Sequence, residues 1–173
     1  MHWQAVFLDR EGIVTPALKP GEYVLRSEQA LVRPEVISFK PLTDRRVPIF
    51  LVSNQSCINR GLITKEEAWR LHELIVRELA ERGICIKESR LCPHQDQDAC
   101  VCRKPKPGMI IDLCLAHGLE PSQTVMIGDQ RRDAEAGQAA GCGLNVWVTE
   151  QPDGDVPAGV CVVRDFEEAM ALL

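Results

Sequence analysis

Short runs of hydrophobic residues alternate with segments of helical periodicity along the chain. The apolar runs are nearly continuous and rich in Val, Ile and Leu, which is typical of strands in a parallel sheet covered on both faces. We expect six such strands, at residues 3–8, 47–52, 84–91, 124–127, 143–148 and 159–163. The pattern predicts an α/β protein with three layers, a Rossmann-like parallel sheet with helices on both faces.

The clearest helix lies over residues 64–82. Thr64 and Glu67 have the spacing of a capping box, and apolar residues recur on one face at helical intervals. Gly83 follows at a position where a left-handed cap is common. Further helices are expected at residues 109–117, 131–140 and 166–172.

Two segments interrupt the regular alternation. Residues 34–46 are expected to hold a helix that Pro41 kinks or splits. Residues 10–33 are too long for an ordinary strand-to-helix loop, so we expect a flap or a small hairpin over the sheet edge. Because no linker, repeat or large insertion is visible, residues 1–173 are expected to form a single domain without a separate cap domain.

Composition narrows the class of protein. The chain has 173 residues, 45% of them hydrophobic, and a formal net charge of −5. The acidic balance argues against a nucleic-acid or anionic-membrane partner. No apolar run approaches the ~18 residues that a membrane helix needs, and the first residues lack the features of a secretory signal. We therefore expect a cytoplasmic protein, with a monomer as the default.

Polar side chains follow three of the predicted strands. Ligands of open α/β sheets bind beyond the carboxyl ends of the strands, so these side chains are expected at one edge of the sheet. They are Asp9 after the first strand, Ser53, Asn54 and Gln55 after the second, and Asp129 and Asp133 after the fourth.

The chemistry of this set suits a phosphate ester. Mg²⁺ prefers one or two carboxylates together with substrate phosphate, while hydroxyl, amide and Lys groups bind phosphate oxygens. Taken singly, each residue has another interpretation, because an Asp after a strand is commonly a helix cap or turn residue and Lys104 can belong to a solvated basic face. Their combination favours a Mg²⁺-assisted phosphoryl-transfer pocket.

Part of the cysteine content is concentrated in one short segment. The chain has 8 cysteines, and CPHQDQDACVC contains three of them with one histidine. Cys92, His94, Cys100 and Cys102 form the ligand set of a closed tetrahedral zinc site, which is structural rather than catalytic. The alternative is a few unrelated buried thiols beside a surface histidine. We expect Zn²⁺ to staple the loop 91–103.

Read in order, four motifs resemble those of phosphatases of the haloacid dehalogenase (HAD) superfamily. They are DREGI (9–13), SNQ (53–55), RKPKPG (103–108) and GDQRRD (128–133). Within the superfamily, NQSCINRG, CPHQDQDACVC and CRKPKPGM are similar to D-glycero-D-manno-heptose 1,7-bisphosphate 7-phosphatases and to the related histidinol-phosphate phosphatases. The last of these stretches favours the heptose bisphosphate branch.

The resemblance implies a role for each motif residue. Asp9 would attack phosphorus and form an aspartyl phosphate, and Glu11 would serve as acid and base. Mg²⁺ would bind the Asp9 and Asp129 side chains and the Glu11 backbone carbonyl. The phosphate and the rest of the substrate would contact Ser53, Asn54, Gln55, Arg60, Arg103 and Lys104, with Asp133 supporting the metal shell or Lys104.

Glu11 is the most serious departure from the family pattern, which has Asp there. One extra methylene moves the carboxyl by over ~1 Å, and a misplacement of that size can cost about 10²-fold in rate. Ile13, Cys57 and Gln130 also differ from the usual Thr, Gly and Lys. Two interpretations follow: an active phosphomonoesterase for a small phosphorylated metabolite, or a weakened relative that binds a phosphorylated ligand or a partner.

Overall fold

The computed structural model describes residues 3–173 and contains one sheet of six parallel strands. In chain order these are β1 (Ala5–Leu8), β2 (Ile49–Asn54), β3 (Ile86–Cys92), β4 (Thr124–Gly128), β5 (Leu144–Val148) and β6 (Val160–Val163). Across the sheet their order is β3-β2-β1-β4-β5-β6, and every neighbouring pair is parallel. The six predicted strands are confirmed, with small differences at their ends.

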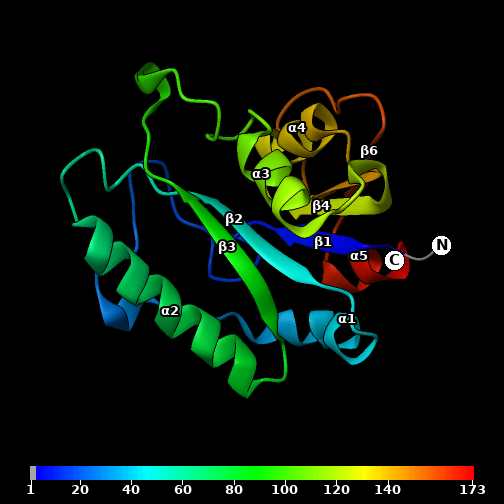
Figure 1. Ribbon diagram of the computed structural model, residues 1–173, viewed down its shortest axis with the longest axis horizontal. Helices are drawn as coiled ribbons and strands as arrows, with labels where there is room; N and C mark the ends of the chain where they lie inside the picture. Colours follow the sequence, from blue (N-terminus) through cyan, green and yellow to red (C-terminus); the bar gives the residue numbers. More distant parts are fainter. Residues whose placement is uncertain (1–2) are drawn as a thin grey trace.

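The helices cover both faces of this sheet, so the predicted three-layer α/β fold is confirmed. They are α1 (Lys40–Asp44), α2 (Lys65–Glu81), α3 (Gly108–His117), α4 (Arg131–Ala140) and α5 (Phe166–Ala171). Figure 1 shows α1 and α2 on one face, with α3 and α4 on the other. A 3₁₀ helix over Pro34–Phe39 precedes α1, and Pro41 lies in the first turn of α1. The predicted split of segment 34–46 is therefore confirmed.

Strand alternation divides the core into two layers. Val6 and Leu8 pack in the cluster that includes the buried face of α2, whereas Ala5 and Phe7 pack in the cluster formed with α3 and α4. Phe7 also stacks on Phe50, with ring centroids 5.4 Å apart. Because both faces of these strands are covered, the sequence shows continuous apolar runs rather than alternation.

The start and end of α2 follow the sequence signals only in part. The Thr64 hydroxyl accepts a hydrogen bond from the Glu67 backbone N–H at 3.1 Å, which confirms the N-cap. The Glu67 side chain binds Arg70 instead of reaching back to Thr64, so the reciprocal half of the capping box is replaced by an ion pair. Gly83, with φ of +81°, ends the helix as predicted.

Residues 10–33 form a packed flap, and the hairpin alternative is wrong. The segment contains a parallel bridge between Glu11 and Thr15 and one 3₁₀ turn, and the rest is irregular. Buried valines anchor it to the core, and the Arg33 guanidinium donates a hydrogen bond to the Gly12 carbonyl. The flap is thereby held against the sheet edge where the first motif begins.

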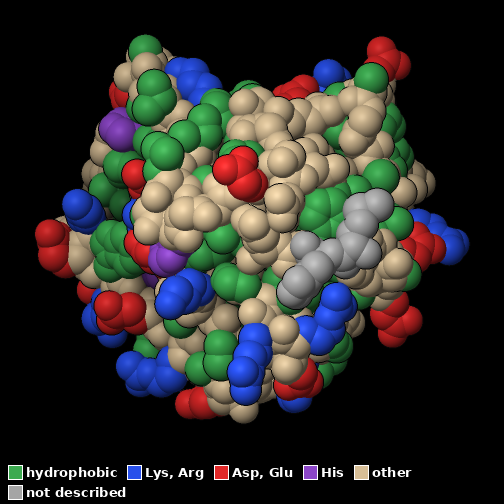
Figure 2. All heavy atoms as spheres, turned by 45° about the vertical axis from the view of Figure 1, so that its right-hand side comes forward, with side chains coloured by type: hydrophobic (Ala, Val, Ile, Leu, Met, Phe, Trp, Pro, Cys, Tyr) green, Lys and Arg blue, Asp and Glu red, His purple; other side chains and the backbone are tan. Residues whose placement is uncertain are grey.

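Within residues 3–173, no helix has the length and hydrophobicity needed to cross a membrane. On the face drawn in Figure 2, acidic and basic side chains are interspersed with hydrophobic ones. This mixed surface agrees with the modest net charge of −5.

Candidate active site

Three central strands bring the predicted site residues to one edge of the sheet. Asp9 follows β1, Ser53 lies near the end of β2, and Asp129 follows β4. β1 lies between β2 and β4, so their carboxyl ends are neighbours, and the strand order reverses between β1 and β4. Such a switch point is where open α/β sheets bind ligands. A cavity of about 400 Å³ opens there, lined by Asp9, Asp129 and the flap residues 18–24.

Lys104, which follows the cysteine cluster in the chain, extends its side chain to the same edge of the sheet. Its side chain is buried, and its Nζ lies 2.6 Å from Asp9 Oδ1, 2.7 Å from Asp133 Oδ1 and 2.8 Å from the Val52 carbonyl oxygen. Burial alone would lower the pKa of Lys104, but Asp133 and Asp9 outweigh it and raise the pKa above its usual value. The lysine is therefore held as a buried cation between two carboxylates.

The single ammonium leaves the carboxylates of the site incompletely neutralised. Burial and the Asp133 charge hold the pKa of Asp9 well above its usual value, although Lys104 opposes them. Burial also raises the pKa of Asp129. Three acidic groups thus share one lysine, and each raised pKa marks a carboxylate that would be stabilised by a further cation.

The donor set fits a hard divalent cation. Carboxylate oxygens of Asp9, Asp129 and Asp133 lie within 4.8 Å of one another. Asp129 Oδ1 is buried and lacks a hydrogen-bond partner among the described residues, while Asp129 Oδ2 accepts from Gln130 at 3.0 Å. An unpartnered buried oxygen beside other carboxylates is the arrangement expected for an Mg²⁺ ligand.

Close contacts from two elements fix Asp129. The Trp147 indole N–H donates to the Asp129 carbonyl oxygen at 3.0 Å. Gly12 has a φ of +88°, and a Cβ there would come within 2.1 Å of the Asp129 carboxyl. The glycine of the first motif therefore provides both the left-handed turn and the space that the fourth motif occupies.

Glu11 is held tightly beside the cavity. Its carboxylate forms an ion pair with Arg10 and accepts hydrogen bonds from the Ser53 hydroxyl at 2.7 Å and the Gln55 amide at 3.0 Å. Burial would raise the pKa of Glu11, but Arg10 and the bonds from Ser53 and Gln55 outweigh it, so the pKa is lowered. In this arrangement Glu11 is held as a carboxylate, and its lowered pKa makes it a weaker base than a free glutamate.

The same contacts occupy Ser53. Its hydroxyl donates to Glu11 and accepts from the Gln55 amide at 2.8 Å, and the residue is fully buried. Glu11 lines the cavity, so a phosphate oxygen can reach the Ser53 hydroxyl only after Glu11 has released it. The Gln55 side-chain amide is bonded to both Glu11 and Ser53, and the residue also lines the cavity.

The remaining predicted substrate residues take two different positions. Arg60 and Arg103 line the outer part of the cavity, where the Arg103 guanidinium binds Asp96 at 2.6 Å and the His94 carbonyl at 3.2 Å. Asn54 lines the cavity as well, but its side-chain amide is bonded to the backbone of Lys104. Arg60 and Arg103 could meet an anionic group outside the catalytic centre.

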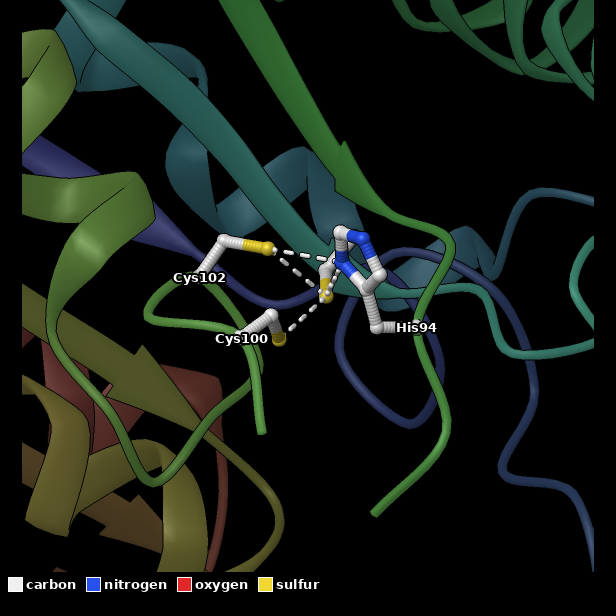
Figure 3. A group of neighbouring side chains, drawn as sticks. His94, Cys100 and Cys102 are labelled. Atoms are coloured by element: carbon white, nitrogen blue, oxygen red, sulfur yellow. Dashed lines mark hydrogen bonds between the residues drawn. The ribbon is translucent and has the colours of Figure 1, made fainter. Parts of the chain in front are cut away.

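The four predicted zinc ligands meet in one cluster. Cys92 Sγ lies 3.0 Å from Cys102 Sγ and 3.8 Å from Cys100 Sγ, and His94 Nδ1 lies 3.2 Å from Cys102 Sγ. Figure 3 shows the His94 ring and the two labelled cysteines directed toward a common point. Four ligand atoms within 4.8 Å of one another could hold a metal ion. Their composition, three sulfurs and one imidazole, fits Zn²⁺.

Two residues that build the site were missed at the level of sequence. Arg10 is only 2% exposed and neutralises Glu11. Its position between two carboxylates in DREGI is the signal that could have revealed it. Trp147 was included in a strand without a role, and no local pattern indicates its bond to Asp129.

Comparisons with known proteins agree with this geometry. A family model described as HAD-hydrolase-like matches residues 101–150. D-glycero-beta-D-manno-heptose-1,7-bisphosphate 7-phosphatase of Rhodopseudomonas palustris is 32% identical over 79% of this chain and 79% of its own. The enzyme of the same name from Bordetella bronchiseptica is 31% identical over 93% of this chain and 92% of its own.

The chain belongs to the heptose bisphosphate phosphatase family.

A solved structure supports this assignment to the family. The crystal structure of D,D-heptose 1,7-bisphosphate phosphatase from B. bronchiseptica, complexed with magnesium and phosphate, has a TM-score of 0.88 and 27% identity. The match covers 98% of this chain and 97% of that one. The identification as a HAD phosphatase is therefore confirmed, and residues 3–173 show no separate cap domain.

Proposed function

We propose that the chain is an Mg²⁺-dependent phosphomonoesterase that acts on a heptose 1,7-bisphosphate through an aspartyl phosphate. The observation that carries this proposal is the convergence of Asp9, Lys104 and Asp129 at one sheet edge, with Asp9 Oδ1 2.6 Å from the lysine. The names of the relatives support the choice of substrate. Histidinol phosphate is the alternative substrate, because the sequence motifs also resemble those of histidinol-phosphate phosphatases.

Asp9 supplies the nucleophile in this proposal. One carboxylate oxygen attacks phosphorus, the bond from phosphorus to the ester oxygen breaks, and the departing oxygen takes a proton. Water then attacks phosphorus, the bond to Asp9 breaks, and inorganic phosphate leaves. Mg²⁺ held by the carboxylates of Asp9 and Asp129 and the Glu11 carbonyl would offset the charge repulsion between nucleophile and phosphate. Lys104 holds Asp9 in place, and it would bind a phosphoryl oxygen by exchanging one of the three bonds that its ammonium donates to Asp9, Asp133 and the Val52 carbonyl.

Glu11 is the proposed acid and base. Arg10 holds it in the ionised form that the base role requires, but opposes its uptake of a proton in both roles. As a carboxylate bonded to Arg10, it can take a proton from the attacking water. To protonate a leaving group it must first acquire a proton, which the Arg10 pair opposes. Substrate phosphate that takes over the Ser53 hydroxyl removes one of the bonds that keep Glu11 ionised.

The outer cavity supports a substrate with a second anionic group. Arg60 and Arg103 line it on one side, and the flap residues 18–24 line it on another. Guanidinium groups bind phosphate oxygens in a bidentate manner. In this proposal one phosphate of the sugar lies at Asp9 and the other lies near these arginines.

Zn²⁺ is the proposed occupant of the Cys92, His94, Cys100 and Cys102 cluster. The cluster closes a loop that ends one residue before Arg103, and the Arg103 backbone N–H lies 3.4 Å from Cys100 Sγ. A closed tetrahedral site keeps no position for water, so the metal would fix the loop rather than take part in hydrolysis. It would thereby help to place Arg103 and Lys104.

A weakened relative that binds phosphorylated ligands is the second candidate function. The contact that favours it is the bond from Ser53 to Glu11, because it occupies a proposed phosphate donor. Four expectations stay predictions from the sequence: a single domain over residues 1–173, a cytoplasmic location, a monomeric state and the absence of a nucleic-acid partner.

Purified protein with Mg²⁺ should release phosphate from a heptose 1,7-bisphosphate faster than from histidinol phosphate or simple sugar monophosphates. The reason is that only the bisphosphate can contact both Asp9 and the outer arginines. A coupled phosphate assay measures kcat/KM for each compound, with Asp9→Asn as the control that lacks the nucleophilic oxygen. Wild-type turnover no higher than that of Asp9→Asn would overturn the proposed activity.

Glu11→Asp should raise kcat by about tenfold, because the shorter side chain withdraws from Ser53 and restores the family's carboxyl position. Steady-state kinetics with the best substrate checks this. Glu11→Gln, which cannot exchange a proton, should lose activity and serves as the matched control. A fall in kcat for Glu11→Asp would mean that the glutamate is itself the adapted acid and base.

Protein purified without a chelator should contain about one Zn²⁺ per chain, measured by elemental analysis. Cys100→Ser should lose this zinc and increase hydrogen exchange over residues 91–103, because the loop then lacks its staple. Cys85→Ser, an exposed cysteine outside the cluster, is the matched control and should retain zinc. Zinc-free wild-type protein with a rigid loop would contradict the proposed site.

A further inference from the structure

Asn54 makes a two-point contact with the backbone of Lys104. Asn54 Nδ2 donates to the Lys104 carbonyl oxygen at 3.0 Å, and Asn54 Oδ1 accepts from the Lys104 backbone N–H at 3.0 Å. The two bonds join groups separated by fifty residues in the chain. A pair of antiparallel hydrogen bonds fixes orientation as well as distance. The side chain that the sequence suggested as a substrate contact is thus committed to the lysine.

The backbone of Asn54 is itself fixed at the other end of the cysteine loop. In the sheet, Asn54 of β2 is paired with Cys92 of β3, and the next backbone N–H, of Gln55, donates to the Cys92 carbonyl at 2.7 Å. Cys92 begins the cysteine loop, residues 92–102, and Lys104 lies two residues after its last residue, Cys102. Asn54 therefore connects the two ends of that loop to the rigid end of β2.

Lys104 needs this anchor because its own side chain is long. A lysine side chain is a flexible chain of four methylene groups, and it loses rotamer entropy when its ammonium is held in one place. The ammonium must reach Asp9, Asp133 and the Val52 carbonyl together. These three partners are fixed, so the point at which the stem leaves the backbone decides whether all three are reached at once.

We propose that Asn54 is a positioning residue for Lys104 and not a ligand of the substrate. Val52 and Asn54 lie two residues apart on β2, one accepting from the lysine ammonium and the other holding the lysine backbone. The end of β2 thus holds Lys104 at both ends of its side chain. The proposal rests on the phosphatase activity proposed above. In it, Asn54 holds Lys104, which in turn contacts the nucleophile Asp9.

Asn54→Ala should lower kcat/KM by about tenfold for both a heptose 1,7-bisphosphate and p-nitrophenyl phosphate, because two hydrogen bonds to Lys104 are lost. The two esters share only the phosphoryl group that meets Lys104 and Asp9. A loss confined to the sugar bisphosphate would show that Asn54 contacts the sugar or its second phosphate, and would overturn the proposal. Unchanged kinetics on both esters would overturn it as well.

A double-mutant cycle on phosphate binding separates action through Lys104 from general loosening of the site. The dissociation constant of inorganic phosphate is measured by calorimetry with Mg²⁺ for wild type, Asn54→Ala, Lys104→Met and the double variant. Asn54→Ala should weaken binding about tenfold in the wild-type background and by less than about twofold once Lys104 is gone. Equal losses in both backgrounds would contradict the proposal.

Asn59→Ala is the matched control for these measurements. Asn59 also reaches the cysteine loop, through a bond from its side chain to Asp98 at 3.0 Å, but it is exposed and makes no hydrogen bond to Lys104 among the described residues. It should change neither kinetics nor phosphate binding. Zinc content and thermal unfolding verify that each variant is folded, and Asn54→Ser replaces Asn54→Ala in both experiments if the alanine variant fails that check.

These outcomes are distinguishable from failure of the proposed function. A wild-type protein that hydrolyses neither ester refutes the phosphatase proposal, whereas the phosphate-binding cycle requires no turnover. If the wild type is active but Asn54→Ala weakens phosphate binding equally with and without Lys104, only the proposed role of Asn54 is refuted.

Discussion

One buried ammonium shared by several carboxylates is the interaction on which the site depends. Lys104 Nζ contacts Asp9 and Asp133 within 2.7 Å, in a place where these side chains are almost fully buried. Charges that are removed from water must be paired, and truncating one partner of a buried pair is strongly destabilising. The pair also holds Asp9, the proposed nucleophile, so in the proposed mechanism the same contact serves both stability and chemistry. Asp129 Oδ1 has no hydrogen-bond partner within residues 3–173, so it is available to a second cation.

The topology explains why such a cluster can form from distant segments. Asp9 and Lys104 are separated by 95 residues, but the parallel sheet brings the ends of β1, β2 and β4 together. Gly12 allows the first loop to approach Asp129, and Trp147 holds the Asp129 backbone from β5. Each catalytic loop is therefore secured by a side chain from another element. The cysteine cluster and Asn54 do the same for Lys104.

Much of this could be predicted from the sequence because its signals are local or periodic. The strands were recognised from continuous apolar runs, and the Cys/His cluster from spacing within CPHQDQDACVC. The irregular course of residues 10–33 could not be read, because it follows from tertiary contacts such as that of Arg33 with Gly12. The uses of Asn54 and Gln55 were also beyond the sequence, since an amide after a strand has the same pattern whether it binds substrate or the protein.

Glu11 illustrates the same limit in its chemistry. The sequence indicates a longer carboxylate at the acid/base position, but only the fold places Arg10, Ser53 and Gln55 around it. The Glu11 carboxylate thereby takes up the Ser53 hydroxyl, which is the proposed phosphate donor. The hydrogen bond from Ser53 to Glu11 is thus the contact through which this departure from the family pattern would affect activity.

In the proposed site, the carboxylates of Asp9 and Asp129 require a metal cation in addition to Lys104. Their raised pKa values mean that the metal-free folded state binds extra protons, so its stability is lost as pH rises through those values. Mg²⁺ replaces these protons, and the rise in Tm that it causes should be larger at about pH 8 than at about pH 5. Thermal unfolding with and without Mg²⁺ measures this directly, and Asp129→Asn should remove most of the effect. An Mg²⁺ effect that is equal at both pH values, or that survives in Asp129→Asn, would contradict the account.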